Sequence, residues 1–154
     1  MNSLLKIKLN NPDLISLYRN HSHAYHDDSG IDLFIAETTI IPPGALGHKI
    51  SLGISLEMIM NSKNTSYFIM SRSSMCKSKL RLTNAIYLID SGFRGNLFIF
   101  VDNFTAEPVK VNFGDSYVQI CNHNLSRINC IVVDNLSAGT RNEKGLGSSG
   151  ISKL

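Results

Sequence analysis

The chain has 154 residues, of which 43% are hydrophobic and 18% charged, and this suits one globular domain with a buried core. Its formal net charge of +3 is small and its basic residues are scattered, which argues against a nucleic-acid surface and favours a small anionic ligand. Three cysteines without a Cys-x-x-Cys pair argue against a disulfide framework and a structural zinc site, and they favour a reducing compartment.

The N-terminal stretch MNSLLKIKLNN alternates leucine or isoleucine with lysine, which predicts a β-strand and not the apolar core of a signal peptide. No stretch of the sequence is long and apolar enough to span a bilayer. We therefore expect a soluble protein of the cytoplasm or another intracellular compartment, with neither a membrane nor a nucleic acid as partner.

Short runs rich in β-branched and aromatic residues follow, and turn residues separate them. The runs are GIDLFIAETTII (30–41), HKISLGISL (48–56), YFIMS (67–71), AIYLID (85–90), NLFIFVDN (96–103), VKVNF (109–113), YVQICN (117–122) and INCIVVDN (128–135). Many short strands with such punctuation predict an all-β fold of the antiparallel sandwich, barrel or jelly-roll type. One short helix is expected at about residues 73–80.

Asp32 lies within an otherwise apolar strand, where a carboxylate is costly unless it is paired, exposed or near a cation. It could hold a magnesium ion through water, because Mg²⁺ keeps several of its waters. An ordinary polar residue on a half-buried strand is an equally good interpretation. The preceding stretch HSHAYHDD holds three histidines, but their spacing matches no common zinc pattern.

The stretch SRSS places Arg72, Ser73 and Ser74 at the start of the expected helix, where backbone N–H groups and a guanidinium favour an anion. A serine N-cap beside a solvated arginine is the alternative. Further along, Gln119 lies between apolar neighbours in GDSYVQI and requires a hydrogen-bond partner from the backbone or from a ligand.

The stretch LIDSGFRG ends an apolar run with a carboxylate, Asp90, directly before a Ser-Gly turn. We expect a β-hairpin in which alternation places Ile86 and Leu88 on the face of Asp90, with Tyr87 and Ile89 on the other face.

Such a hairpin can offer its backbone groups to the edge of a base, together with the amide of Asn84. Phe93 could then stack on a sugar, and Asp90 could accept a proton from water. The alternative is a plain hairpin with an aspartate as turn cap.

From Ser137 onward the chain is rich in glycine and serine, which predicts a β-domain over residues 1–137 and a flexible C-terminal arm over residues 138–154. Composition alone indicates a frayed tail. Arg141 and the backbone N–H groups of GLGSSG also permit an arm that folds over phosphates.

Taken in order, SGIDL, SRSS, NAIYLIDSGFRG, GDSYVQ and RNEKGLGSSG resemble the five motifs of the trimeric dUTPases, over about residues 28–150. The resemblance implies a homotrimer of jelly-roll subunits that hydrolyses dUTP to dUMP and pyrophosphate with Mg²⁺. Each active site would draw on all three chains.

The resemblance also implies roles for particular residues. Asp90 matches the aspartate that contacts the deoxyribose and activates the water that attacks the α-phosphate, and Phe93 matches a sugar-stacking aromatic residue, usually tyrosine. The other implied groups are the phosphate side (Arg72, Ser73, Ser74, Gln119), the uracil-reading hairpin (Asn84 and the backbone of Ile86, Tyr87, Leu88 and Ile89), the closing arm (Arg141, Leu146, Gly147, Ser148, Ser149) and a water-mediated magnesium contact (Asp32).

Several residues depart from the family pattern. Tyr87 stands where the family has glycine, Leu146 replaces the phenylalanine that caps the base, and Asn142 and Lys144 replace glycines of the arm. We expect these changes to affect rate and affinity more than the type of reaction.

Two alternatives remain open. The related dCTP deaminases carry a glutamate on the strand after this hairpin, but Phe100 occupies the matching position and cannot move protons. A jelly-roll protein that binds a nucleotide or a partner without catalysis is the second alternative, which Tyr87 and Leu146 favour and Asp90, Arg72 and Asp32 oppose.

Overall fold

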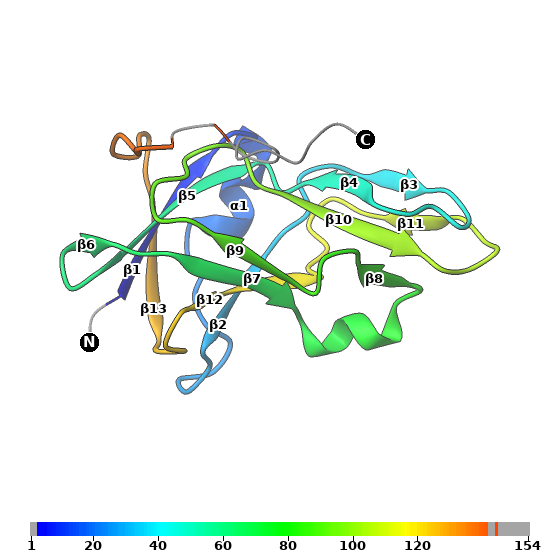
Figure 1. Cartoon of the computed structure of the whole chain (residues 1–154), viewed down its shortest axis with the longest axis horizontal. Helices are drawn as coiled ribbons and strands as arrows, with labels where there is room; N and C mark the ends of the chain where they lie inside the picture. Colours follow the sequence, from blue (N-terminus) through cyan, green and yellow to red (C-terminus); the bar gives the residue numbers. More distant parts are fainter. Residues whose placement is uncertain (1–2, 142–143, 145–154) are drawn as a thin grey trace, which may run out of the picture.

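Short β-strands make up most of the regular structure in the computed structural model, which describes residues 3–141 and 144 (Figure 1). The strands are β1 (Ser3–Leu9), β2 (Gly30–Leu33), β3 (Thr39–Ile41), β4 (His48–Ser51), β5 (Ile54–Met60), β6 (Lys63–Asn64), β7 (Tyr67–Ser71), β8 (Leu80–Leu82), β9 (Ile86–Ile89), β10 (Phe98–Asn103), β11 (Val109–Val111), β12 (Val118–Asn122) and β13 (Ile128–Val132). The helical segments are the 3₁₀-helices η1 (Pro12–Leu14) and η2 (Ser73–Lys77) and the α-helix α1 (Ile15–Tyr18). None of these helices has the length and apolar character needed to cross a membrane.

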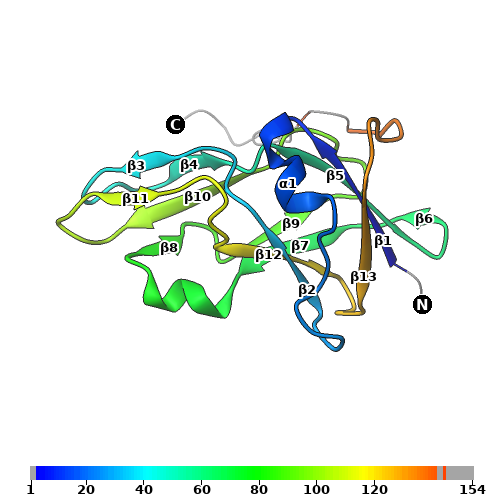
Figure 2. The ribbon, with the colours of Figure 1, turned by 180° about the vertical axis from the view of Figure 1, so that it is seen from behind.

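The strands form sheets with the orders β13-β1-β5-β6, β2-β12-β7-β9, β4-β10-β8 and β11-β3. All pairs are antiparallel except β1 with β13, which runs parallel. Figures 1 and 2 show β3, β4, β10 and β11 side by side at one end of the molecule and the strands β1, β5 and β13 at the other. The predicted all-β architecture is confirmed.

Period-two alternation decides which side chains form the core. Leu5 and Ile7 of β1 are completely buried, whereas Lys6 and Lys8 between and after them are partly exposed. The run 48–56 divides into β4 and β5 at Gly53, which has a φ of +63° and lies so close to Ala36 that a Cβ would come within 2.6 Å of its methyl group. Local turn chemistry therefore sets the strand boundaries.

The helical segments differ from the expectation. η2 spans residues 73–77 instead of about 73–80, and it is a 3₁₀-helix. η1 and α1 are not among the expected elements, although Asn11 caps η1 by accepting a hydrogen bond from the N–H of Asp13 and Pro12 stands at its first position. These two signals could have predicted the helical turn.

A buried charge cluster connects the sheets to the loop that follows β9. Glu57 of β5 is 1% exposed, and its carboxylate lies 3.4 Å from Nζ of Lys6 and 3.5 Å from Nη2 of Arg94. Ser137 donates to the same carboxylate from its backbone N–H, at 3.2 Å, and from its hydroxyl. Burial alone would raise the pKa of Glu57, but the hydrogen bonds of Ser137 and the two cations outweigh burial and lower it.

We predict that Glu57→Gln lowers the free energy of unfolding at pH 7 by about 3–5 kcal/mol, because the buried guanidinium of Arg94 loses its counter-charge. The lowered pKa of Glu57 means that its contribution is complete above the ordinary value of 4.5 and is lost as the pH falls through the folded-state value. Urea unfolding at pH 7 and at decreasing pH below 4.5 should show the difference between the two proteins shrinking.

The matched control is Glu107→Gln, which changes an exposed glutamate and should alter stability by less than about 0.5 kcal/mol. Equal stability of wild type and Glu57→Gln at pH 7 would contradict a structural role for the charge cluster.

Candidate functional site

Asp90 lies at the end of β9, where a tight turn fixes its backbone. The N–H of Phe93 donates to the carbonyl of Asp90 at 3.0 Å, so the chain turns at Ser91 and Gly92 as predicted. Arg94 donates from Nη1 to the carbonyls of Ser91 and Phe93, each at 2.8 Å. Because Arg94 is itself held by buried Glu57, the turn that carries Asp90 is attached to the core.

The carboxylate of Asp90 forms an ion pair with Arg141, and the backbone N–H of Arg141 donates to the carbonyl of Gly92 at 3.3 Å. The side chains of Asp90 and Arg141 are 49% and 47% exposed, so water reaches the carboxylate. The approach is close, since a Cβ on Gly139 would lie 2.1 Å from the carbonyl oxygen of Gly92. The structure therefore brings together two predicted site residues that are far apart in sequence.

The two strands that the turn joins belong to different sheets. β9 pairs with β7, with Tyr87 opposite Ile69, whereas β10 pairs with β4 and β8. The expected two-stranded hairpin ladder is therefore wrong, although the turn is right. Tyr87 and Ile89 pack against the core, and the paired edge of β9 is satisfied by β7.

Alternation along β9 follows the prediction. Ile86 and Leu88 are 53% and 61% exposed, whereas Tyr87 and Ile89 are half-buried. The side chain of Asn84 is exposed, so its amide is accessible to a ligand. Phe93 is half-buried and packs partly against the core, which fixes the position of its ring after the turn.

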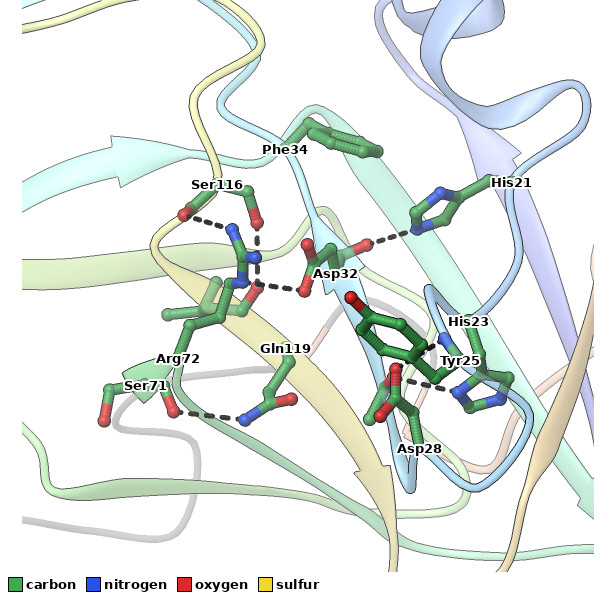
Figure 3. A network of polar contacts seen from close by, with 12 residues as sticks. His21, His23, Tyr25, Asp28, Asp32, Phe34, Ser71, Arg72, Ser116 and Gln119 are labelled. Atoms are coloured by element: carbon green, nitrogen blue, oxygen red, sulfur yellow. Dashed lines mark hydrogen bonds and ion pairs between the residues drawn. The ribbon is translucent and has the colours of Figure 1, made fainter. Parts of the chain in front are cut away.

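A second polar group lies where β2, β7 and β12 meet (Figure 3). Nε of Arg72 lies 2.8 Å from Oδ1 of Asp32, and its Nη1 donates to the carbonyl of Ser116 at 3.1 Å. Gln119 stands opposite Asp32 in the β2–β12 register and donates to the carbonyl of Ser71 at 3.3 Å. Three predicted site residues thus share one surface, and the partner that Gln119 requires comes from the backbone.

Arg72, and not a serine, is the N-cap residue of η2, and its side chain forms no cap hydrogen bond. Ser73 and Ser74 open the helix with exposed side chains, and neither hydroxyl has a hydrogen-bond partner within the described residues. The two hydroxyls therefore remain accessible beside the guanidinium.

The histidines of the segment 21–26 have structural partners. His21 contacts the carbonyl of Asp32 at 2.8 Å, and His23 contacts the carbonyls of Gly30 and Ile128 at 3.0 and 2.8 Å. Burial lowers the pKa of His21, which favours its neutral form. Within residues 3–141 and 144 no three His, Cys, Asp or Glu side chains converge as metal ligands. A single carboxylate, Asp32, suits a magnesium ion that is held mainly by phosphates and water.

Basic side chains line a groove beside Arg94. The groove is lined by the cationic side chains of Lys8, Arg94, Arg141 and Lys144. Ser137 and Thr140 also line it with their hydroxyls. Such a lining favours a polyanion such as a triphosphate. The remaining arm residues predicted for the site (Leu146, Gly147, Ser148 and Ser149), together with Asn142, lie outside the described residues.

Three supporting residues have no role in the sequence-based prediction: Glu57, Arg94 and Ser116. The signal for Glu57 is a lone carboxylate within the apolar run ISLEMIM, since a buried charge requires a partner. No local pattern identifies that partner as Arg94, because the contact joins distant parts of the chain.

Comparison with known proteins agrees with this geometry. The family model described as dUTPase matches residues 20–150. A relative from Clostridium tetani, named deoxyuridine 5'-triphosphate nucleotidohydrolase, is 33% identical over 148 residues and covers 95% of this chain and 96% of its own length.

Solved structures show the same fold. The dUTPase of Staphylococcus bacteriophage 80alpha, a mutant studied with dUpNHpp, superposes with a TM-score of 0.62 at 20% identity and covers 96% of this chain and 98% of its own. The dUTPase of phage phi11 of S. aureus, a mutant described for the coordination of a structural Mg(II) ion, has a TM-score of 0.58 at 21% identity and covers 76% of this chain and 88% of its own. The predicted jelly-roll fold is confirmed.

Proposed function

This chain belongs to the dUTPase family, and we propose that it hydrolyses dUTP to dUMP and pyrophosphate with a water molecule that Asp90 activates. Its relatives carry the name of this activity, and the chain is a dUTP diphosphatase. The observation that best supports the role of Asp90 is its geometry, a half-exposed carboxylate on a turn that is attached to the core through Arg94.

Asp90 would accept a proton from a water molecule, and the resulting hydroxide would attack the α-phosphate. The bond to the β-phosphate then breaks and pyrophosphate leaves. Because Asp90 directly follows the strand proposed to face the base, a correctly bound nucleoside would place the α-phosphate beside the same carboxylate. Phe93, half-buried after the turn, would stack on the deoxyribose.

In the proposed trimer the triphosphate would bind between the surface around Arg72 of one chain and the basic groove beside Arg94 of another, since the β7–β9 register separates these two surfaces within one chain. Arg72 would contact phosphate oxygens together with Ser73 and Ser74, and Gln119 would contribute from the neighbouring strand. Asp32 would hold Mg²⁺ through water, and the ion, when bound, would neutralise charge on the departing pyrophosphate. The structural Mg(II) described for the phage phi11 dUTPase agrees with this cofactor.

The active form would be a homotrimer in which each site draws on several chains. Residues 138–154 would form the arm that closes over the nucleotide, with Arg141 on the phosphates and Leu146, Gly147, Ser148 and Ser149 covering the base and phosphates. Such closure would exclude water other than the attacking one.

We place the enzyme in the cytoplasm or another reducing intracellular compartment, where its substrate is found. Cys76, Cys121 and Cys130 are free thiols, which agrees with such a compartment.

The purified protein should hydrolyse dUTP with a preference over dCTP of up to roughly 10⁴-fold, because groups that hydrogen-bond one base edge are left unpaired by another. Pyrophosphate release measured with dUTP, dCTP, dTTP and UTP tests this preference. Chelation of Mg²⁺ should abolish turnover, and added Mg²⁺ should restore it. Comparable turnover of dCTP, or none of dUTP, would refute the proposed function.

Asp90→Asn should lower kcat by roughly 10²–10⁴-fold, because the amide keeps the shape of the carboxylate but cannot accept the proton. Nucleotide binding, measured by calorimetry, should be retained. Asp134→Asn, which changes an exposed aspartate after β13, is the control and should keep the parental rate. Turnover by Asp90→Asn near the wild-type rate would make Asp90 a turn cap.

Truncation after Ser137 tests the arm, and mixing tests the shared site. The truncated chain and Asp90→Asn should each be nearly inactive, the first because Arg141 and the rest of the arm are missing.

The shared site is tested by mixing the truncated chain with Asp90→Asn in equal amounts. If Asp90 and the arm of one site come from different chains, the mixed trimers should regain roughly a quarter of the wild-type sites. If they come from one chain, as the contact between Asp90 and Arg141 also permits, no activity returns. Sedimentation of an active monomer would contradict the trimer.

A further inference from the structure

The side chain of Gln119 on β12 lies against Gly30, the first residue of β2. A Cβ on Gly30 would lie 2.1 Å from Oε1 of Gln119, 2.8 Å from its Cδ and 3.2 Å from its Cγ. The first two distances are shorter than the contacts that Cβ atoms make in folded proteins. Gly30 pairs with Cys121, two residues after Gln119, so it is the diagonal neighbour of Gln119 across the two strands. Any side chain at position 30 would therefore force the amide of Gln119 to move.

The conformation of the backbone does not explain the glycine at position 30. Gly30 begins a regular strand and is not among the glycines with positive φ. The three atoms nearest to the missing Cβ all belong to Gln119. The contact that excludes a side chain at position 30 is therefore the one with Gln119.

The other direction along the sheet leads from Gln119 to the pair of Arg72 with Asp32. Gln119 stands directly opposite Asp32 in the β2–β12 register, and positions 30 and 32 lie on one face of β2 because side chains alternate. Figure 3 shows Gln119 on the same surface as Arg72, with its Nε2 donating to the carbonyl of Ser71 at 3.3 Å. An amide pushed toward Asp32 could donate to the carboxylate and accept from the guanidinium. It would then occupy the two groups that are proposed to bind Mg²⁺ and phosphate.

We propose that Gly30 is a positioning residue for the phosphate side of the site. Because position 30 has no side chain, the amide of Gln119 lies away from the pair of Arg72 with Asp32 and leaves both groups to the ligands. The proposal rests on the proposed function, in which Arg72 and Gln119 bind phosphate oxygens. It adds a residue that contacts no ligand and acts through Gln119.

A substitution at position 30 should change binding more than folding. The atoms that must move are the end of a flexible side chain, and Gln119 is only half-buried. Its displacement therefore costs little stability, whereas the groups that it would reach are those proposed for the ligands.

The test measures binding of inorganic pyrophosphate in the presence of Mg²⁺ by calorimetry. Gly30→Ala should bind pyrophosphate roughly tenfold more weakly than the wild type, because the displaced amide competes for the guanidinium and the carboxylate. In a Gln119→Ala background the same substitution should have no further effect, since no amide remains to be displaced.

A structural role of Gly30 that does not involve Gln119 predicts a different result. The losses of affinity caused by Gly30→Ala and Gln119→Ala would then add in the double variant. Additive losses overturn the proposal, and so does a Gly30→Ala protein with wild-type affinity for pyrophosphate. A wild type that binds no pyrophosphate overturns it as well.

Gly47→Ala is the matched control, because Gly47 has a φ of +64° and no atom within 4 Å of an added Cβ. It lies directly before β4, in a different sheet from Gly30. The substitution strains the backbone and should lower stability without a change in the affinity for pyrophosphate.

Nuclear magnetic resonance supplies a test on the wild type that needs no folded variant. The Hγ protons of Gln119 should show an NOE to an Hα proton of Gly30, because Cγ would contact a Cβ at this position. The absence of this NOE means that the amide does not lie against Gly30, and the proposal fails. In Gly30→Ala the side-chain amide resonances of Gln119, assigned by their loss in Gln119→Ala, should shift. Failure of the proposed function is recognised separately, as the absence of dUTP hydrolysis by a wild type in which the NOE is present.

Discussion

The buried pair of Glu57 and Arg94 is the constraint on which the candidate site depends. A carboxylate that is 1% exposed is tolerated only because two cations and two hydrogen bonds of Ser137 surround it. Arg94 then uses its remaining donors on the carbonyls of the turn after Asp90 and on the carbonyl of Ser137. One buried charge thus fixes the turn that carries the proposed base and the backbone at Ser137 after β13.

The divergence of β9 from β10 is the second determinant of the site. In an ordinary hairpin the facing N–H and C=O groups of the two strands would bond to each other. Here β9 joins the sheet of β7, and the backbone of Phe100 is hydrogen-bonded by the hydroxyl of Tyr87 and by the N–H of Thr83. The hydroxyl of Tyr87 thus connects the two strands at the place where they separate.

Much of the fold follows from local patterns, and much of the site does not. Alternation in β1 and β9 predicts both the strands and their buried faces, because burial of one sheet face has a period of two. The Ser-Gly dipeptide predicts the reversal after Asp90, and this too is a signal contained in neighbouring residues. The partner strand of β9, the pair of Arg72 with Asp32 and the contact of Glu57 with Arg94 join residues far apart in sequence, and no local pattern contains them. The catalytic and binding roles of the site residues remain predictions, since they concern a substrate and not the folded chain.

The polar groups of the site fall into two energetic classes. Arg72 with Asp32 and Arg141 with Asp90 are pairs whose side chains are between 32% and 49% exposed, and such pairs contribute about 0–1 kcal/mol. A phosphate or a metal ion can therefore replace a partner at little cost. The side chains of Glu57 and Arg94 are 2% and 7% exposed, and exchange there would leave a buried charge unpaired. The molecule thus keeps exchangeable pairs where the substrate is proposed to bind and a permanent pair that holds the turn after Asp90, so that exchange of the surface pairs would leave this turn in place.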